Sequence, residues 1–371
     1  MMLKKWSDVL TIMSGKNQKA VVSPNGPYPI YGSGGIMGRA DDFLCEAGTT
    51  IVGRKGTINC PIFVNEPFWN VDTAFGISPG DELHPKYLYY FCCSFNFKEL
   101  DKSTTIPSLA KRDLLQIQMP VPHLNEQERI VSKIEELFSR LDASVAELQT
   151  AKEKLKVYRQ AVLFRAFQNL TDTITMDKVA DMIDPQPSHR TPPEVMDGVP
   201  YIGVGDIDYS VHKVNFSEAR KVSPSVLEEH RERYTLHKGD FIIGKIGTIG
   251  KPFVVPLPQD YTLSANVILI QPNCEKIVPE FLYWQFSSPL VTQQLTTGAV
   301  ATNQQAFGIK KARLLSIKMC CVELQRQIVS EIEGALSICD SIQQTIDTSL
   351  RLANALRQSI LKQAFEGALA T

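Results

Sequence analysis

The chain has 371 residues, of which 43% are hydrophobic and 21% charged. This is the composition of a folded globular protein and excludes an intrinsically disordered one. The 39 basic and 40 acidic side chains leave a formal charge of −1, so any binding of nucleic acid must come from local clusters of charge. No apolar run approaches the roughly 20 residues of a membrane helix. Because the N-terminal pattern also argues against a signal peptide, we expect a cytoplasmic protein that does not contact a membrane.

Residues 1–123 have the pattern of a small α+β module. Short runs of Val, Ile, Phe and Tyr are separated by Gly and Pro, which indicates short strands. A helix is expected at 87–97, begun by Pro85.

Residues 124–168 have the periodicity of one long amphipathic helix. Apolar residues follow steps of three and four: Ile130, Ile134, Leu137, Leu141, Val145, Leu148, Leu155, Tyr158 and Val162. Such a narrow stripe is typical of a coiled coil. About 45 helical residues would extend roughly 65 Å, so we predict a spacer helix over 124–170.

Residues 171–321 repeat the first module loosely. The segment from Gly53 to Pro61 matches the one from Gly244 to Pro252, and Pro85-Lys-Tyr-Leu-Tyr-Tyr90 matches Pro279-Glu-Phe-Leu-Tyr-Trp284. A second module of the same kind is therefore expected, with a helix at 280–287.

Residues 322–366 repeat residues 124–168 without a gap. Identical pairs include Gln127 and Gln325, Ile134 and Ile332, Asp142 and Asp340, Arg159 and Arg357, and Phe167 and Phe365. We predict a second spacer helix over 322–371 that packs against the first, antiparallel or nearly so. The alternative, two ordinary core helices of larger domains, explains neither the equal lengths nor the shared register. The predicted fold class is α+β, with two modules of small curved sheets separated by an antiparallel coiled coil.

Several catalytic and metal-binding patterns fail. The segment from Gly244 to Lys251 lacks the Gly-Lys-Ser/Thr of a P-loop, and 32–38 gives no GxGxxG. The eight cysteines form no CxxC and are expected to be buried and reduced. Asp206 and Asp208 could hold a metal, but carboxylates after a glycine more often cap turns. The six histidines have no ligand-like spacing and are each expected to be a surface or loop residue, so we predict neither cofactor nor metal.

Polar and basic segments at corresponding places in the two modules are the candidate binding residues. Asn and Gln can bond adenine, while Lys and Arg suit guanine or phosphate. For Arg54 and Lys245, the flanking glycines and the lack of neighbouring carboxylates in sequence favour exposed cations over a buried ion pair. The candidates are Arg54, Lys55, Thr57, Asn59, Ser108, Lys111 and Arg112 in the first module, and Lys245, Thr248, Lys251, Asn303, Gln304, Gln305, Lys310 and Lys311 in the second.

Three segments resemble the specificity subunit of type I restriction-modification systems. They are Pro120-Val-Pro-His-Leu-Asn-Glu-Gln-Glu-Arg-Ile-Val-Ser-Lys-Ile-Glu135, Thr105-Ile-Pro-Ser-Leu109 and Gly247-Thr-Ile-Gly-Lys251. The start of the second helix, from Cys320 to Gln325, departs from the family's proline-rich form. The resemblance otherwise covers essentially the whole chain.

This resemblance implies a non-catalytic, DNA-binding chain. Segments 1–123 and 171–321 would be target recognition domains, each reading one half of a bipartite sequence in double-stranded DNA. The helices would set the gap and dock two DNA-methyltransferase subunits, which methylate adenine N6 with S-adenosylmethionine. ATP-dependent restriction subunits would complete the complex. The alternatives are the specificity subunit of a related type II-like DNA-modifying enzyme and a coiled-coil scaffold that does not bind DNA.

Overall fold

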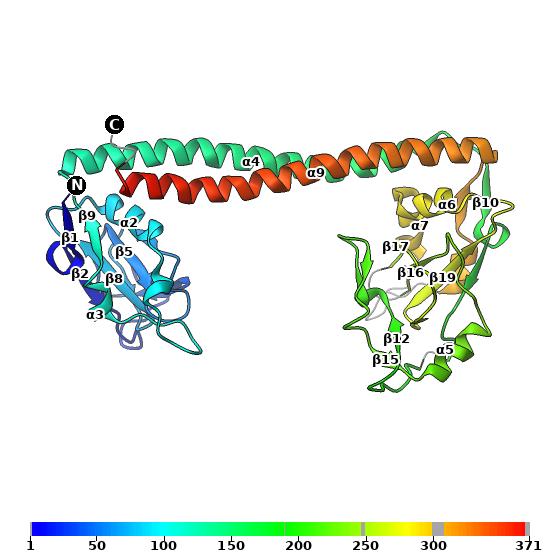
Figure 1. The fold of residues 1–371 in the computed structure, drawn as a ribbon, viewed down its shortest axis with the longest axis horizontal. Coiled ribbons are helices and arrows are strands. Elements are labelled where there is room, and N and C mark those ends of the chain that lie inside the picture. The colour runs from blue at the N-terminus through cyan, green and yellow to red at the C-terminus, as the bar shows by residue number, and fades with distance from the viewer. Residues whose placement is uncertain (1, 189, 246–248, 299–307, 368–371) are drawn as a thin grey trace. The chain divides into compact units, whose positions relative to one another are not determined.

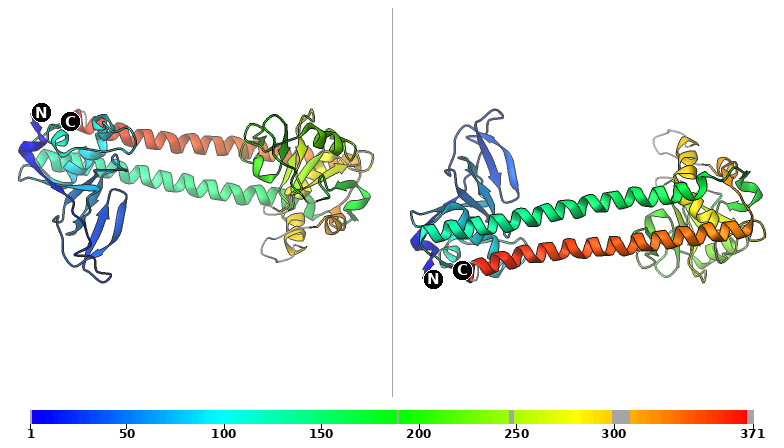
Figure 2. Two further views of the ribbon diagram at one scale, coloured as in Figure 1. Left: turned by 90° about the horizontal axis from the view of Figure 1, so that it is seen from below. Right: turned by 90° about the horizontal axis from the view of Figure 1, so that it is seen from above.

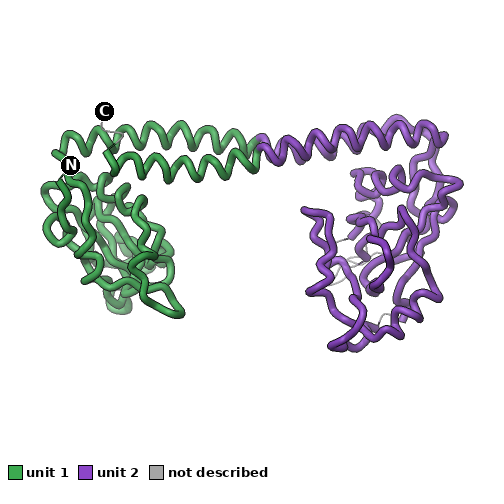
Figure 3. Tube along the Cα trace, in the orientation of Figure 1, with its two compact units in different colours: residues 1–150, 346–371 green, residues 151–345 purple. Residues whose placement is uncertain are grey.

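The structure, a computed structural model, describes residues 2–188, 190–245, 249–298 and 308–367. The chain divides into two compact units (Figure 3). Unit 1 comprises residues 1–150 and 346–371, and unit 2 comprises residues 151–345. Each unit contains one globular module and part of each of two long helices.

The long helices are α4 (Leu124–Gln168) and α9 (Val322–Phe365), at the positions predicted from the repeat. Within each unit the two helices lie side by side (Figures 1 and 2). A module and the other helix cover most of the apolar stripe, although Tyr158, Ile342 and Leu356 stay exposed. In unit 1 the buried residues of this stripe are Ile130, Ile134, Phe138, Ile360, Leu361 and Ala364. In unit 2 they are Leu163, Phe167, Ile328, Val329 and Ile332.

One pair of repeat positions joins the helices in both units. In unit 1, the guanidinium of Arg357 pairs with the carboxylate of Asp142. In unit 2, the guanidinium of Arg159 pairs with Asp340 at 2.6 Å. The later residue of α4, Arg159, pairs with the earlier residue of α9, Asp340, and the earlier residue Asp142 pairs with the later residue Arg357. The helices therefore run in opposite directions, and the predicted antiparallel packing is confirmed.

Module 1 contains two small sheets. The first is antiparallel, in the order β2 (Leu10–Ser14), β8 (Ala74–Pro79), β5 (Thr49–Gly53), β6 (Ile62–Val64). The second has the order β4 (Gly35–Ala40), β3 (Tyr28–Gly32), β7 (Trp69–Asn70), with β3 and β7 parallel. A short pair, β1 (Leu3–Lys5) with β9 (Gln118–Pro120), leads into α4. The helices of the module are α1 (Trp6–Val9), α2 (Pro85–Ser94), a 3₁₀ turn (Phe97–Leu100) and α3 (Lys111–Leu114).

Module 2 repeats this topology. Its first sheet has the order β11 (Ala180–Ile183), β19 (Val267–Pro272), β16 (Phe241–Gly244), β17 (Pro252–Val254). Its second sheet has the order β15 (Lys221–Val222), β12 (Val199–Ile202), β18 (Thr262–Leu263), with β12 and β18 parallel. The pair β10 (Thr173–Thr175) with β20 (Ser316–Lys318) leads into α9. The helices are α5 (Pro224–Arg231), α6 (Pro279–Ser287), α7 (Pro289–Gly298) and α8 (Ile309–Arg313), with 3₁₀ turns at Met176–Lys178 and Val204–Asp206. The hairpin of β13 (Ile207–Asp208) and β14 (Lys213–Val214), together with α5, has no counterpart in module 1.

Equivalent helices attach each module to the long pair. In unit 1, the ring of Tyr87 on α2 meets Phe365 of α9 at 5.1 Å between centroids. In unit 2, Phe281 on α6 meets Phe167 of α4 at 5.4 Å. Phe365 and Phe167 are equivalent positions of the repeat, so the duplication extends to the packing of the modules.

Three expectations from the sequence need correction. Helix α2 ends at Ser94 rather than at 97, because the chain turns there and restarts as a separate 3₁₀ turn. All eight cysteines are free thiols, but Cys60, Cys274 and Cys321 are exposed. His230, expected at the surface, is buried on α5.

The turn interpretation of the two carboxylates in module 2 is confirmed. Asp206 accepts the backbone N–H of Gly203 at 2.8 Å, and Asp208 accepts that of Ser210 at 2.8 Å. No helix within the described ranges is long and apolar enough to cross a membrane.

His230 belongs to a buried polar chain in module 2. Its Nε2 faces the side-chain carbonyl of Gln186, and its Nδ1 faces the Thr262 hydroxyl. The geometry fits a neutral ring that donates from Nε2 and accepts at Nδ1. Burial lowers the pKa of His230, because the imidazolium would lose its hydration.

We expect the free energy of unfolding of unit 2 to fall as the pH drops below about 6.5, the ordinary pKa of histidine. Above this value both states hold a neutral ring; below it the unfolded chain binds a proton that the folded unit resists until its own lower pKa is reached. Urea unfolding between pH 8 and pH 5, followed by hydrogen exchange of residues 224–231, measures the loss.

The variant His230→Gln is the control, because its amide can form both hydrogen bonds without titrating near neutral pH. Asp240, whose pKa burial raises, contributes with the opposite sign, and the variant retains it. An equal decline in the variant would contradict the prediction.

Candidate nucleic-acid interface

The candidate loop of module 1 begins where β5 ends, at Gly53. A Cβ on Gly53 would lie 2.0 Å from the carbonyl oxygen of Thr57, so only glycine lets the loop fold back so closely. The backbone N–H of Arg54 then donates to the carbonyl of Thr73 at 2.8 Å. The buried strand thus holds the first basic residue of the loop at the end of the sheet.

Backbone hydrogen bonds join this loop to the segment before α3. The N–H of Gly56 donates to Pro107 O at 2.9 Å, and the N–H of Leu109 donates to Arg54 O at 2.9 Å. Lys55 and Ser108 form a β-bridge between these two bonds. The two candidate segments of module 1, some 50 residues apart in sequence, therefore form a single surface.

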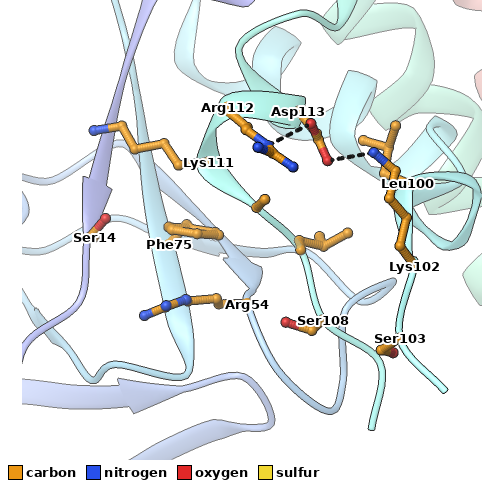
Figure 4. A pocket seen from close by; sticks show the side chains of 12 residues that line it. Ser14, Arg54, Phe75, Leu100, Lys102, Ser103, Ser108, Lys111, Arg112 and Asp113 are labelled. Atoms are coloured by element: carbon orange, nitrogen blue, oxygen red, sulfur yellow. Dashed lines mark hydrogen bonds and ion pairs between the residues drawn. The ribbon is translucent and has the colours of Figure 1, made fainter. Parts of the chain in front are cut away.

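A depression of about 640 Å³ lies on this surface (Figure 4). Four basic side chains and one carboxylate line it: Arg54, Lys102, Lys111, Arg112 and Asp113. The charge of the depression is positive although the whole chain is nearly neutral. Such a local cluster is the arrangement that a polyanion requires.

Two of these cations are held by backbone rather than by carboxylates. Lys111 donates from Nζ to Ile12 O at 2.7 Å, and Arg54 donates from Nη1 to Asp72 O at 3.3 Å. The guanidinium of Arg54 also lies 5.9 Å from the ring centre of Phe75. Within the described ranges neither cation has an ion pair, so no protein carboxylate competes with a ligand for them.

The other two cations share Asp113. Lys102 lies 3.1 Å and Arg112 lies 3.4 Å from its carboxylate oxygens. The side chain of Arg112 is 83% exposed, so this pairing contributes little to stability and can exchange for a phosphate.

A carboxylate orders the loop beneath the depression. Asp101 accepts hydrogen bonds from the Ser103 hydroxyl at 2.6 Å and from the Ser108 N–H at 3.0 Å. The Ser103 hydroxyl, then the Ser108 N–H, hold the pKa of Asp101 below its usual range. The loop that presents Lys102 and Ser108 therefore keeps its shape at neutral pH.

The remaining candidates of module 1 do not all lie at the basic depression. Lys55 and Thr57 are exposed on the loop. Asn59 instead accepts the backbone N–H of Phe97 at 2.7 Å, which caps the 3₁₀ turn, and it lines a different hollow with Arg357. The structure therefore does not bring Asn59 together with Arg54.

The corresponding loop of module 2 begins in the same way but directs its cation elsewhere. The N–H of Lys245 donates to Asn266 O at 2.8 Å, as Arg54 does to Thr73. The ammonium of Lys245 then pairs with Asp184 at 2.8 Å, with side-chain exposures of 12% and 16%. The expectation of an exposed Lys245 is wrong, because a carboxylate 61 residues away in sequence reaches it in the fold.

The other candidate cations of module 2 that lie within the described residues are exposed. Lys251 lies 4.0 Å from the ring centre of Tyr209. Lys310 and Lys311 lie on α8, which precedes β20 as α3 precedes β9. Thr248, Asn303, Gln304 and Gln305 lie outside the described residues.

Sequence reasoning missed several residues of the basic depression. Ser14 and Phe75 come from β2 and β8, and Lys102 comes from the loop ordered by Asp101. No motif links these positions, because only strand pairing brings them together. Asp113, next to Lys111 and Arg112 in sequence, was the one visible sign that some of the positive charge is paired.

A sequence model of the family described as "Type I restriction modification DNA specificity domain" matches residues 1–153 and 190–350. The specificity subunit of the type I restriction enzyme EcoBI from Escherichia coli is 25% identical over 349 residues, covering 86% of this chain and 73% of that protein. A putative type I specificity subunit from Haemophilus influenzae is 20% identical, covering 90% and 87%.

Two solved structures share the fold. A chain from a structure on complex assembly and conformational transition of the type I R-M system has a TM-score of 0.74 at 16% identity, covering 99% of this chain and 98% of that one. The HsdS subunit from Thermoanaerobacter tengcongensis has a TM-score of 0.58 at 16% identity, covering 99% and 97%.

We expect Lys245→Ala to lower the free energy of unfolding of unit 2 by about 2 kcal/mol, because it removes a half-buried ion pair with the largely buried carboxylate of Asp184. The control Lys251→Ala removes an exposed ammonium from the face of Tyr209 and should cost under about 1 kcal/mol. Urea denaturation of the two variants measures the difference. Equal stability of both would contradict a structural role for Lys245.

Proposed function

The chain belongs to the type I restriction-modification DNA specificity family, and we propose that its two modules each read one half of a bipartite target in double-stranded DNA. The observation that carries this proposal is the duplication of the whole unit, module and helix together. Two modules of equal topology can bind two half-sites in equivalent ways, while different loops read different bases.

In this proposal the long helices set the gap between the half-sites. The 45 residues of α4 form one helix without a break, and at 1.5 Å per residue its length is about 68 Å. A continuous helix paired along its apolar stripe resists bending, which makes it suitable as a spacer. Segments 1–123 and 171–321 are then the two recognition domains.

The basic depression of module 1 supports a DNA contact. Arg54 and Lys111 present charge from backbone-held positions, and Ser108 supplies a hydroxyl beside them. These groups suit phosphate oxygens or guanine edges. We place the candidates Lys55, Thr57 and Arg112 in the same contact, and Lys251, Lys310 and Lys311 in that of module 2.

We further propose that catalysis lies in partner subunits. Two methyltransferase subunits would dock on the helices, and ATP-dependent restriction subunits would join them in the cytoplasm. The formal charge of −1 implies that much of the general affinity for DNA comes from these partners.

Lengthening both helices equally should lengthen the gap and leave both half-sites unchanged. About seven residues inserted near Ala151, with a matched insertion near Ser349, add roughly 10 Å, comparable to three base pairs at 3.4 Å each. Methylation mapping of the assembled complex measures the gap. An insertion in α4 alone is the control, which should abolish recognition because it shifts the helices out of register. Altered half-sites with an unchanged gap would overturn the spacer role.

The role of Arg54 can be tested by the salt dependence of DNA binding. If its side chain holds a phosphate, Arg54→Ala should weaken binding to all sequences alike and lower the salt slope by about one. If it grips a guanine edge, the loss should be about 1 to 3 kcal/mol for the cognate sequence alone.

Titration against cognate and scrambled duplexes at two salt concentrations separates these outcomes. Lys133→Ala, which removes a cation paired with Glu136 on α4, is the control and should change neither quantity. Unchanged affinity of Arg54→Ala for both duplexes would remove the depression from the DNA contact.

A further inference from the structure

A fully buried glutamine lies in the first turn of each long helix. Gln127 of α4 and Gln325 of α9 are both 0% exposed. They occupy equivalent positions of the repeat, although the segments that lead into the two helices differ. A buried amide is costly unless each of its polar groups has a partner.

In unit 1, the amide of Gln127 joins three backbone groups. Its Oε1 accepts the N–H of His84 at 2.8 Å. Its Nε2 donates to Glu82 O at 2.7 Å and to Pro122 O at 2.8 Å. His84 is the residue that caps the start of α2, and Pro122 leads from the module into α4. One side chain thus links the long helix, the chain that enters it and the helix on which the module rests.

Unit 2 has the same arrangement. The Oε1 of Gln325 accepts the N–H of Val278 at 2.8 Å, and its Nε2 donates to Cys320 O at 2.9 Å. Val278 caps the start of α6, as His84 caps that of α2. Cys320 corresponds to Pro122 in the repeat. Because the amide donates to a backbone carbonyl in both units, the hydrogen bond forms whether the residue at this repeat position is Pro122 or Cys320.

The two kinds of contact between a module and the long helices constrain different motions. The rings of Tyr87 and Phe365, or of Phe281 and Phe167, are held by apolar burial, which has no preferred direction. Hydrogen bonds weaken steeply when their angle changes. The amide therefore fixes how α2 or α6 is inclined to the long helix, while the rings hold the two together.

We propose that Gln127 and Gln325 are positioning residues for DNA recognition: each sets the inclination of its module on the long helix and so restricts the target to one gap length. This inference rests on the proposed function of the helices as a spacer. One base pair displaces a half-site by about 3.4 Å and by about a tenth of a turn. A module that can tilt by a few ångströms at its binding surface would accept more than one gap.

The test uses Gln127→Met and Gln325→Met, which keep the length of the side chain and remove its hydrogen bonds. Full-length variants, assembled with methyltransferase subunits, select from duplexes with a randomised 30-base-pair window, and the bound pool is sequenced. We expect the native complex to enrich two half-sites at one gap. Each variant should enrich the same half-sites while its preference for that gap over its neighbours falls by about tenfold, a factor that corresponds to roughly 1.4 kcal/mol, within the range of a hydrogen bond to a buried partner.

The controls Gln160→Met and Gln358→Met make the same change at equivalent exposed positions of α4 and α9 and should preserve the native gap. Hydrogen exchange adds a direct measurement, since the amide protons of His84 and Val278 should exchange faster in the respective variants. If Gln127→Met does not fold, Gln325→Met, which breaks fewer hydrogen bonds, carries the test.

The outcomes separate this inference from the proposed function. A native complex that enriches no bipartite sequence would overturn the proposed function, and the inference with it. A native complex with one sharp gap, and variants that bind more weakly but with the same sharp gap, would overturn the inference alone. In that case the glutamines would serve stability and not position.

Discussion

Burial of two long apolar stripes is the constraint on which the rest of the structure depends. An isolated helix of 45 residues with the sequence of α4 would expose its stripe to water, at about 25 cal/mol for each Å² of apolar surface. Pairing with α9 covers part of this surface in both units, and each module buries more of it where it packs on the helices. Since apolar burial has no preferred register, the two ion pairs of Asp142 with Arg357 and of Arg159 with Asp340 favour one alignment over its neighbours. Their exposure limits the contribution of each pair to about 1 kcal/mol or less, so the preference they give to this alignment is of the same modest size.

The antiparallel pairing also explains why the two units resemble each other so closely. Each unit combines the start of one long helix with the end of the other, and the sequence repeat places the same residues at both junctions. Phe365 meets Tyr87 in unit 1, while Phe167 meets Phe281 in unit 2. The same packing geometry therefore occurs at both junctions between a module and the long helices. The described differences between the units include loops, the β13–β14 and α5 insertion, and α7, which stands where module 1 has only a 3₁₀ turn; the common sheets are kept.

The charge of the molecule is organised locally. A chain with a formal charge of −1 still places four basic side chains around one depression, because backbone carbonyls and not carboxylates hold two of them. The corresponding loop of module 2 shows the other outcome, since Asp184 removes Lys245 from the surface. A neutral chain with local positive surface limits non-specific attraction to DNA and leaves selectivity to the contacts within each module.

The sequence by itself determined the long helices, their pairing and the duplication of the modules. Periodicity and self-similarity can be read directly from the linear sequence. A helix with one long apolar stripe is most simply buried by packing against a second helix of the same kind. Only the tertiary structure decided which partners and how much burial each polar side chain has. Lys102 joins Arg54 in the depression, Asn59 caps a turn, His230 is buried and Lys245 pairs with Asp184, although nothing near these residues in sequence distinguishes them. The physical reason is that the environment of a polar group depends on atoms that the fold brings within about 3 Å, here from segments that lie 32 to 61 residues away in sequence. Gln127 and Gln325 combine both cases: the repeat marked them as equivalent, but only the fold revealed that each amide joins a module to its helix.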